Sequence, residues 1–288
     1  MKVVPQAFYK HPKIEKVLMD GLSCVILKSI TEADLQNERY LAAHALTLVL
    51  SGALRVEDAS GNLTIVYKNQ MVLLPKGIYA ITDIIPHEGI FEAVVFFFDE
   101  EITDEFLSSF DHTGSDSYEK RLVINYNHQL RLFVDTLLTL YRGKQQNQFT
   151  RSKLLELLHL VALSIKDSEF AKRLVAIRSR EKVPIMTFMQ DNFAKPLDVI
   201  DYAYLSGRSV STFQRDFKSR FGISPKKWLI EKRLEKAATL FKTTSDSVTS
   251  VMLAVGFENS SHFIKTFHKR FGLSPKQFQL RHRKDLYI

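Results

Sequence analysis

Cysteine is nearly absent from this chain of 288 residues, whose sole cysteine is Cys24. A single cysteine excludes a disulfide framework and a cysteine-based zinc site, and Cys24 lies in an apolar run that predicts a small core residue. No stretch approaches the roughly 18 consecutive apolar residues of a membrane-spanning helix. The first residues, MKVVPQAFYKHPKIEK, also lack the apolar centre of a signal peptide. We therefore expect a cytoplasmic protein with no membrane partner.

Acidic residues are scarce in the C-terminal part of the chain. Residues 166–288 contain 24 Lys and Arg against 12 Asp and Glu, a net charge of +12, whereas residues 1–165 have a net charge of −4. Positive charge concentrated in one part of a chain is typical of nucleic-acid binding. The length fits two domains, and a hydrophobic content of 45% is sufficient for two cores.

The basic part contains a repeated block. Residues 213–228 and 263–278 are identical at eight of sixteen positions. Each copy has phenylalanines at helical spacing, a glycine that ends the helix and a Ser-Pro pair that starts another one. A short apolar helix and a glycine-containing turn precede each block, which predicts helix-turn-helix units at about 197–221 and 248–271. Two copies at this period indicate modules that act together.

The outer faces of the second helices carry the candidate DNA contacts. Side chains of the kinds that read base edges are Ser211, Thr212, Gln214 and Arg215 in the first unit, and Ser261, His262 and Lys265 in the second. The basic side chains expected to contact phosphates are Arg208, Lys218, Lys226, Lys227, Lys269 and Arg270. A merely solvated basic face is the common alternative. That alternative has to account for a basic face that occurs twice, on a motif that occurs twice.

One helix is predicted to join the two units. Residues 225–241 have an apolar side and a charged side, and at about 1.5 Å per residue they form a rod of roughly 25 Å. Successive major grooves on one face of DNA recur about every 34 Å. The rod, with half the width of a unit at each end, would place two recognition helices in adjacent grooves of double-stranded DNA.

From about residue 182 to 283, the chain resembles the DNA-binding domain of the AraC/XylS family of bacterial transcriptional regulators. The resemblance rests on the Phe217-Lys218 step, both Gly-x-Ser-Pro turns, IEKRLEKAATLFKTT at 230–244 and VGFENSSHF at 255–263. The family usually has a small residue at the position of Met252, and the first unit keeps Ala203 in the equivalent place. The resemblance implies a sequence-specific regulator that activates transcription by contacting RNA polymerase. The residues themselves do not separate an activator from a repressor.

Residues from about 22 to 99 show a strand pattern. Short runs rich in β-branched and aromatic residues alternate with turn signals such as Gly52 and Pro75-Lys76-Gly77. The pattern predicts a small antiparallel barrel or double-sheet roll, and it resembles the cupin-like regulatory barrel that precedes many AraC-type domains. The expected fold is therefore α+β in two domains: a cupin-like β-barrel with amphipathic helices, then an all-α tandem helix-turn-helix domain.

A cupin barrel can also be an enzyme. Metal-dependent cupins present two histidines one residue apart with a carboxylate and a third histidine, whereas His44 and His87 each stand alone here. No Ser-His-Asp or Cys-His set occurs in a promising context. We expect no enzyme activity, catalytic residue, metal or cofactor. The barrel would sense a small molecule, at residues the sequence does not identify, or capture a regulatory protein; a cupin enzyme fused to a DNA-binding domain is the less favoured alternative.

Two amphipathic helices are predicted within residues 120–165. In AraC-like proteins the equivalent helices often form the dimer contact, so the resemblance implies a homodimer, with contact residues Leu154, Leu155, Leu158 and Val161. The alternative is that the helices pack on each other or on the barrel. The charged segment 166–181 is predicted to be a linker between a regulatory domain, 1–165, and a DNA-binding domain, 182–283.

Overall fold

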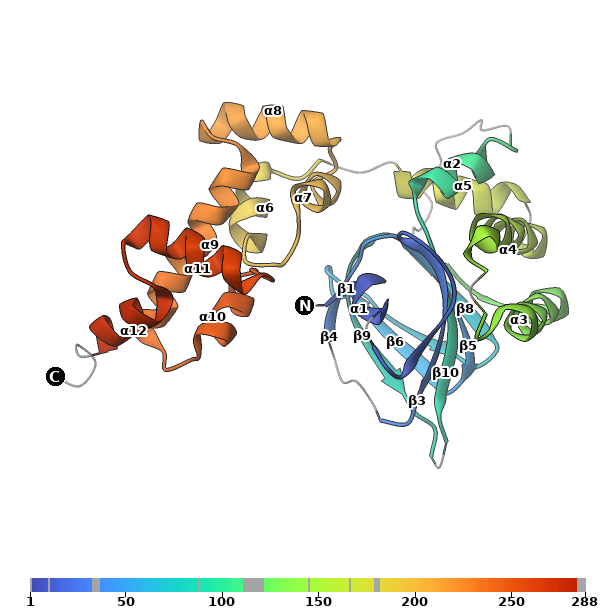
Figure 1. The fold of residues 1–288 in the computed structure, drawn as a ribbon. Coiled ribbons are helices and arrows are strands. Elements are labelled where there is room, and N and C mark those ends of the chain that lie inside the picture. The colour runs from blue at the N-terminus through green and yellow to red at the C-terminus, as the bar shows by residue number, and fades with distance from the viewer. Residues whose placement is uncertain are drawn as a thin grey trace. The chain divides into compact units, whose positions relative to one another are not determined.

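The computed structural model describes residues 2–9, 11–32, 37–87, 89–110, 122–144, 146–165, 167–178 and 182–283. The chain divides into two compact units, Met1–Ser179 and Arg180–Ile288. Figure 1 shows the N-terminal unit as strands with helices on one side, and the C-terminal unit as helices only.

Two β-sheets form the frame of the N-terminal unit. The five-stranded sheet has the order β1-β4-β9-β6-β7, and the six-stranded sheet has the order β11-β8-β5-β10-β3-β2. Neighbouring strands are antiparallel, except that β1 and β4 are parallel. The strands are β1 Lys2–Val4, β2 Ile14–Asp20, β3 Ser23–Ile30, β4 Asn37–Leu41, β5 His44–Ser51, β6 Ala53–Asp58, β7 Leu63–Tyr67, β8 Gln70–Leu74, β9 Gly77–Ile84, β10 Phe91–Phe98 and β11 Leu122–Asn125.

The two sheets face each other without closing into a barrel. Both ends of each sheet are edges, formed by β1 and β7 in one sheet and by β11 and β2 in the other. The α+β class with an all-helical second unit is confirmed, and the predicted closed barrel is corrected to two separate sheets. The strand pattern of the sequence fits both arrangements, because closure depends on which strands pair across the chain.

The six-stranded sheet is buried on both faces. On one face, Ile26, Val49 and Val95 pack against the five-stranded sheet. On the other face, Leu48 and Val94 pack against helices, which Figure 1 shows on that side of the sheet. Burial on both faces explains why β5 and β10 read as continuous apolar runs instead of alternating ones. The helices of this unit are α1 Gln6–Tyr9, α2 Glu100–Leu107, α3 His128–Tyr141, the short helix η1 Asn147–Phe149, α4 Thr150–Ile165 and α5 Asp167–Arg178.

The predicted dimer residues of α4 lie in this core. Leu154, Leu158 and Val161 have no exposed surface, and Leu155 is partly buried against the same cluster. The structure contradicts the prediction for the three buried side chains, because they have no surface to offer a partner. The amphipathic stripe of α4 is accounted for by packing within the unit.

Most of the predicted linker is helix α5. Phe170 and Leu174 of this helix are fully buried in the same core as α4. Residue 166 and residues 179–181 lie outside the described residues. The segment from 167 to 178 therefore belongs to the N-terminal unit as a packed helix.

Seven helices are described in the C-terminal unit, over residues 182–283. They are α6 Ile185–Asn192, α7 Val199–Leu205, α8 Val210–Phe221, α9 Pro225–Thr243, α10 Val248–Ala254, α11 Ser260–Phe271 and α12 Pro275–Arg283. At the start of α8, the Ser209 hydroxyl accepts from the Thr212 backbone N–H. The predicted glycine stop is present: Gly222 ends α8 in the left-handed region at φ +72°. Gly272 ends α11 in the same way at φ +73°. Local signals were sufficient because a cap and a helix stop involve only neighbouring residues.

The same aromatic contact holds each unit to the helix that follows it. The rings of Phe217 and Trp228 meet edge to face at 5.6 Å, and those of Phe267 and Phe278 meet in the same manner at 5.3 Å. Such pairs add about 0.5–1.5 kcal/mol beyond the area they bury. The sequence repeat is therefore a repeat of packing.

Met252 does not alter the turn of the second unit. Its side chain is buried in the core of that unit. The Phe257 N–H donates to the Met252 carbonyl at 3.0 Å, and the Arg208 N–H donates to the Ala203 carbonyl at 3.0 Å. Because the two turns share this hydrogen bond, the larger side chain is accommodated by core packing.

Arg233 of α9 holds the first helix-turn-helix unit to this central helix. Its guanidinium donates to the backbone carbonyl oxygens of Phe193 at 2.8 Å, Lys195 at 2.6 Å and Leu197 at 3.2 Å. The buried Tyr202 hydroxyl supports the same loop by donating to the Asn192 carbonyl at 2.8 Å. Burial raises the pKa of Tyr202 to about 12, so its hydroxyl keeps the proton that it donates.

The turn of the second unit lies against this same loop. Gly256 has a φ of +86°, and a Cβ at this position would meet the Ala194 carbonyl oxygen at 2.6 Å and the Arg233 Nε at 3.1 Å. Only glycine allows this approach without displacing backbone. The loop from 193 to 197 is thus held between α9 and the second unit, and it ties the two helix-turn-helix units together.

Replacing Arg233 with Met should lower the unfolding free energy of the helical unit by about 2–4 kcal/mol, because three carbonyl groups lose a charged donor. Arg233→Lys should recover only part of the loss, since an ammonium cannot reproduce the guanidinium fork. The measurement is chemical denaturation of the full chain, followed by Trp228 fluorescence.

Lys232→Ala is the matched control, because Lys232 pairs with Glu235 at 2.8 Å while both side chains are more than two-fifths exposed. Such surface changes stay within about 0.5 kcal/mol. Equal stability of Arg233→Met and Lys232→Ala would contradict the clamp.

Candidate nucleic-acid interface

Helix α8 presents a polar and basic outer face. Phe213 and Phe217 are fully buried, so the helix turns Ser211, Gln214 and Lys218 outward, where they are exposed. The Arg215 side chain is 77% exposed and lies 3.6 Å from Asp216. An ion pair at that exposure contributes little, so Arg215 is available to a ligand. These side chains are exposed on one helix, and their contact with base edges stays a prediction.

Thr212 is less available than the sequence implied. Its side chain is half-buried in the first turn of α8, and its hydroxyl accepts a hydrogen bond from Ser209 at 3.0 Å. The hydroxyl therefore serves the N-cap and retains one proton to donate.

Arg208 does not lie on the DNA-facing surface. Its side chain is 11% exposed and lies 3.3 Å from the Asp216 carboxylate. Its Nη1 donates to the backbone carbonyl oxygens of Ser206 at 2.7 Å and Val183 at 2.9 Å. The predicted phosphate contact is contradicted, because this guanidinium is used within the unit to hold the turn and the segment before α6.

Helix α11 repeats the arrangement with different side chains. Ser261, His262 and Lys265 are exposed around the buried Phe263, and Lys269 and Arg270 are exposed in the last turn. Basic side chains at this end also favour the negative end of the helix dipole. The helix dipole therefore explains the positive charge of Lys269 and Arg270, but it does not explain the exposed polar residues in the first turns of α11.

Lys226 and Lys227 flank the start of α9. Both are exposed in the first turn, after the N-cap Ser224. A helix N-terminus with adjacent lysines is suited to a phosphate group, because backbone N–H groups and positive charge point the same way. The sequence analysis missed Lys276, which is exposed at the equivalent place in α12. Aligning the repeat, where Lys226 matches Lys276, is the signal that identifies it.

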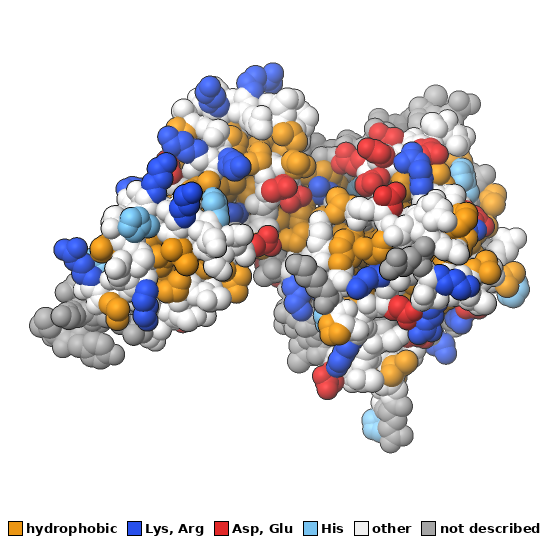
Figure 2. Space-filling model, viewed as in Figure 1, with side chains coloured by type: hydrophobic (Ala, Val, Ile, Leu, Met, Phe, Trp, Pro, Cys, Tyr) orange, Lys and Arg blue, Asp and Glu red, His pale blue; other side chains and the backbone are white. Residues whose placement is uncertain are grey.

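Positive charge is visible over much of this unit. Figure 2 shows Lys and Arg side chains gathered along its upper and outer margin, including the region of α8, with few acidic side chains among them. The lysines and arginines predicted for DNA contact, apart from Arg208, are exposed on α8, α9 and α11. Exposed lysines and arginines beside hydrogen-bonding side chains are the residue types that contact the phosphates and base edges of DNA.

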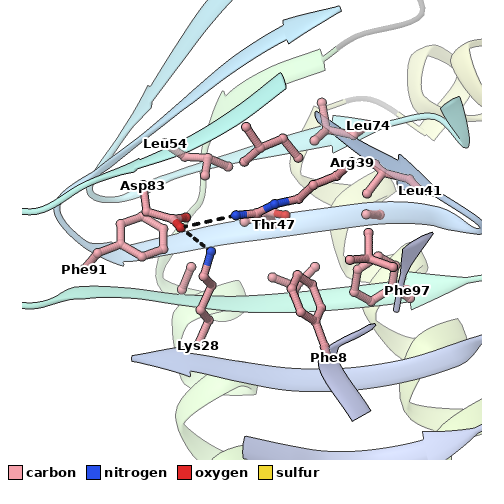
Figure 3. A pocket seen from close by; sticks show the side chains of 15 residues that line it. Phe8, Lys28, Arg39, Leu41, Thr47, Leu54, Leu74, Asp83, Phe91 and Phe97 are labelled. Atoms are coloured by element: carbon pink, nitrogen blue, oxygen red, sulfur yellow. Dashed lines mark hydrogen bonds and ion pairs between the residues drawn. The ribbon is translucent and has the colours of Figure 1, made fainter. Parts of the chain in front are cut away.

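The space between the two sheets is a second candidate site. Figure 3 shows Lys28 and Arg39 converging on Asp83 inside it. The Lys28 ammonium contacts Asp83 Oδ2, the Arg39 guanidinium lies 3.7 Å from the same oxygen, and all three residues are at most 5% exposed. The ion triad links β3 of one sheet to β4 and β9 of the other.

The cavity beside this triad is small. Its volume is about 30 Å³, which is room for one or two water molecules. Pockets for small-molecule ligands typically have about 300–1,000 Å³. The cavity at this place is therefore smaller than such pockets.

His44 of β5 and His87 of the turn after β9 have ordinary surroundings. His44 is 2% exposed, its Nδ1 accepts from the Lys76 N–H at 3.0 Å, and its ring lies 5.6 Å from that of Phe98. His87 is exposed. Within the described ranges, no three His, Cys, Asp or Glu side chains are grouped as metal ligands. No helix of the described residues is long and apolar enough to cross a membrane.

Comparison with known protein families gives two matches. Residues 202–281 match a family described as a helix-turn-helix domain. Residues 44–173 match a family described as the ExsA N-terminal regulatory domain. The two segments fall in the two units of the fold.

Individual relatives agree with these families. The virulence regulon transcriptional activator VirF of Yersinia enterocolitica is 28% identical over 124 residues, which are 43% of this chain and 46% of that protein. The transcriptional regulator ExsA of Pseudomonas aeruginosa is 27% identical over 111 residues, 38% of this chain and 40% of its own. The matches thus span somewhat under half the length of these relatives.

A solved structure covers more of the chain. The crystal structure of an apo variant of ToxT from Vibrio cholerae aligns over 91% of this chain and 98% of its own, with 12% identity and a TM-score of 0.44. The family matches, together with the duplicated helix-turn-helix described above, identify the chain as a member of the AraC/XylS family of bacterial transcriptional regulators.

Proposed function

We propose that this protein is a sequence-specific DNA-binding transcriptional regulator of the bacterial cytoplasm, and an activator. The observation that carries the proposal is the pair of exposed recognition helices, α8 and α11, mounted on one central helix. Helix α9 has 19 residues, which correspond to roughly 28 Å at about 1.5 Å per residue. A rod of that length supports insertion of both helices into successive major grooves, about 34 Å apart.

The roles of the side chains follow from their chemistry. Arg215, Gln214 and Ser211 of α8, and Lys265, His262 and Ser261 of α11, are proposed to contact base edges, with Thr212 contributing one donor. Lys218, Lys226, Lys227, Lys269 and Arg270 are proposed to contact phosphates. Contact with RNA polymerase is proposed from family membership, as is the activating role.

The N-terminal unit is proposed to receive the regulatory signal. The cavity of about 30 Å³ between the sheets is too small for an ordinary effector, and this favours capture of a regulatory protein over binding of a small molecule. No enzymatic role is proposed, because the family to which the chain belongs consists of transcriptional regulators. If the N-terminal unit captures a regulatory protein, only the kind of signal differs, and the DNA-binding function is the same.

A homodimer is proposed through the groove between α3 and α4, in place of the buried face of α4. Leu132 and Leu140 are 57% and 48% exposed on this groove. Lys153 and Glu156, which pair at 2.7 Å, also line it. A two-fold contact sets one patch against its own copy, so a patch with both signs of charge around exposed leucines is self-complementary.

Arg215→Ala is expected to weaken specific binding by about 1–3 kcal/mol and to relax preference at one base pair. Lys218→Ala and Lys227→Ala should weaken all sequences alike and reduce the salt dependence, because they would remove phosphate contacts. Binding is measured with full-length protein on a selected site and on random DNA at several salt concentrations. If Arg215→Ala kept the wild-type ratio of specific to nonspecific affinity, its base-reading role would be wrong.

Inserting about five base pairs between the two contacted segments should abolish the contribution of one unit. Half a helical turn moves one segment to the far side of the duplex, and the Arg233 clamp prevents the units from following it. Footprinting and affinity on the original and extended sites provide the measurement. A site extended by about ten base pairs controls for distance alone. Intact affinity on the five-base-pair insertion would mean that one unit alone reads DNA.

Leu132→Glu should shift the chain towards monomer in sedimentation experiments, because a charge would be buried in the proposed dimer contact. Leu163→Glu is the control, since Leu163 is 67% exposed on α4 and does not line the groove. Equal dimerisation of both variants would exclude this groove as the contact.

A further inference from the structure

The two recognition helices differ at one central position of an otherwise repeated frame. Alignment of the repeat places Ile264 of α11 where α8 has Gln214. At the N-cap of each helix, the side chain of Ser209 or Asn259 accepts a hydrogen bond from a backbone N–H. Both helices end at a glycine in the left-handed region. The backbone frame is thus the same, and position 264 occupies the place of a proposed base contact.

Ile264 is exposed among polar side chains. It is 44% exposed, one turn from Ser261 and next to Lys265. Its neighbours Phe263 and Phe267 are fully buried, so the core of the unit is complete without it. A single exposed apolar residue is ordinary on a protein surface. What distinguishes this one is its place between the side chains proposed to read bases.

The chemistry of the two side chains selects different bases. A glutamine amide can donate and accept together, and it pairs with the N6 and N7 edge of adenine. An isoleucine offers only apolar surface, and the apolar group that the major groove presents is the 5-methyl of thymine. Against guanine or cytosine, the same side chain would desolvate hydrogen-bonding groups without replacing their partners.

We propose that Ile264 reads thymine through its 5-methyl group in the segment contacted by α11, so that the two units recognise different sequences. This inference rests on the proposed DNA-binding function and adds a specificity-determining residue to it. A protein with two different readers binds an asymmetric site, which fixes the direction in which a monomer lies on the DNA.

The test uses full-length protein and a site selected from random duplexes. Each thymine of that site is replaced in turn by deoxyuridine, which lacks only the 5-methyl group. We expect one thymine in the α11 segment at which the replacement weakens wild-type binding about fourfold, as loss of one buried methyl group predicts. Ile264→Ala should bind the thymine and deoxyuridine duplexes equally, because the side chain that contacts the methyl group is gone.

Two further variants sharpen the result. Ile264→Gln should change the preferred base at that position from thymine to adenine. Gln214→Ala is the matched control: it should alter preference in the α8 segment and leave the deoxyuridine effect in the α11 segment intact. Circular dichroism verifies that the exposed substitutions leave the fold unchanged.

The outcomes separate this inference from the function on which it rests. If deoxyuridine has no effect at any thymine of the α11 segment, or if Ile264→Ala keeps the effect, thymine reading by Ile264 is wrong while sequence-specific binding stands. If wild-type protein selects no sequence at all, the proposed function fails and this inference fails with it.

Discussion

The guanidinium of Arg233 is the contact on which the C-terminal unit depends. It donates to the backbone carbonyl oxygens of Phe193, Lys195 and Leu197 in the loop before α7. The Gly256 turn of the second helix-turn-helix unit approaches that loop too closely for any side chain. Two small helical units joined only by one helix would swing independently. Because one loop is held from both sides, α8 and α11 present their outer faces in a fixed relation, and a fixed relation is what recognition of two grooves requires.

The repeat preserves the frame of each unit and varies its surface. Edge-to-face contacts of Phe217 with Trp228 and of Phe267 with Phe278 give both units the same core. Outside that core, Gln214 is replaced by Ile264, and Arg215 by Lys265. A core tolerates few changes, because close-packed side chains transmit any change in volume. Exposed positions carry no such constraint, so the two copies differ there while their cores stay alike.

The N-terminal unit uses its apolar surface internally. Its six-stranded sheet is covered by the second sheet on one face and by helices on the other, and Leu154, Leu157 and Leu158 of α4 are buried in that helical layer. With these side chains of α4 buried, the homodimer contact is proposed at the groove lined by Leu132 and Leu140, which are exposed. The Lys28–Asp83–Arg39 triad links the two sheets, and its buried charges contact one another, since a buried ion without a partner is strongly destabilising.

The sequence by itself determined the helices, caps and turns of the C-terminal unit, the repeat and the exposed faces of α8 and α11, because each depends on residues within a few positions of one another. It predicted strands but not that the two sheets stay open. Tertiary structure alone decided that Leu158 faces a core, that Arg208 binds Val183, 25 residues earlier, and that Arg233 binds Phe193, 40 residues earlier. An amphipathic pattern indicates that one face of a helix is buried, but it does not indicate which segment covers that face. A basic residue in a sequence likewise does not reveal whether its side chain binds a backbone carbonyl or a phosphate. Those choices are made by contacts between distant segments, which exist only once the chain is folded.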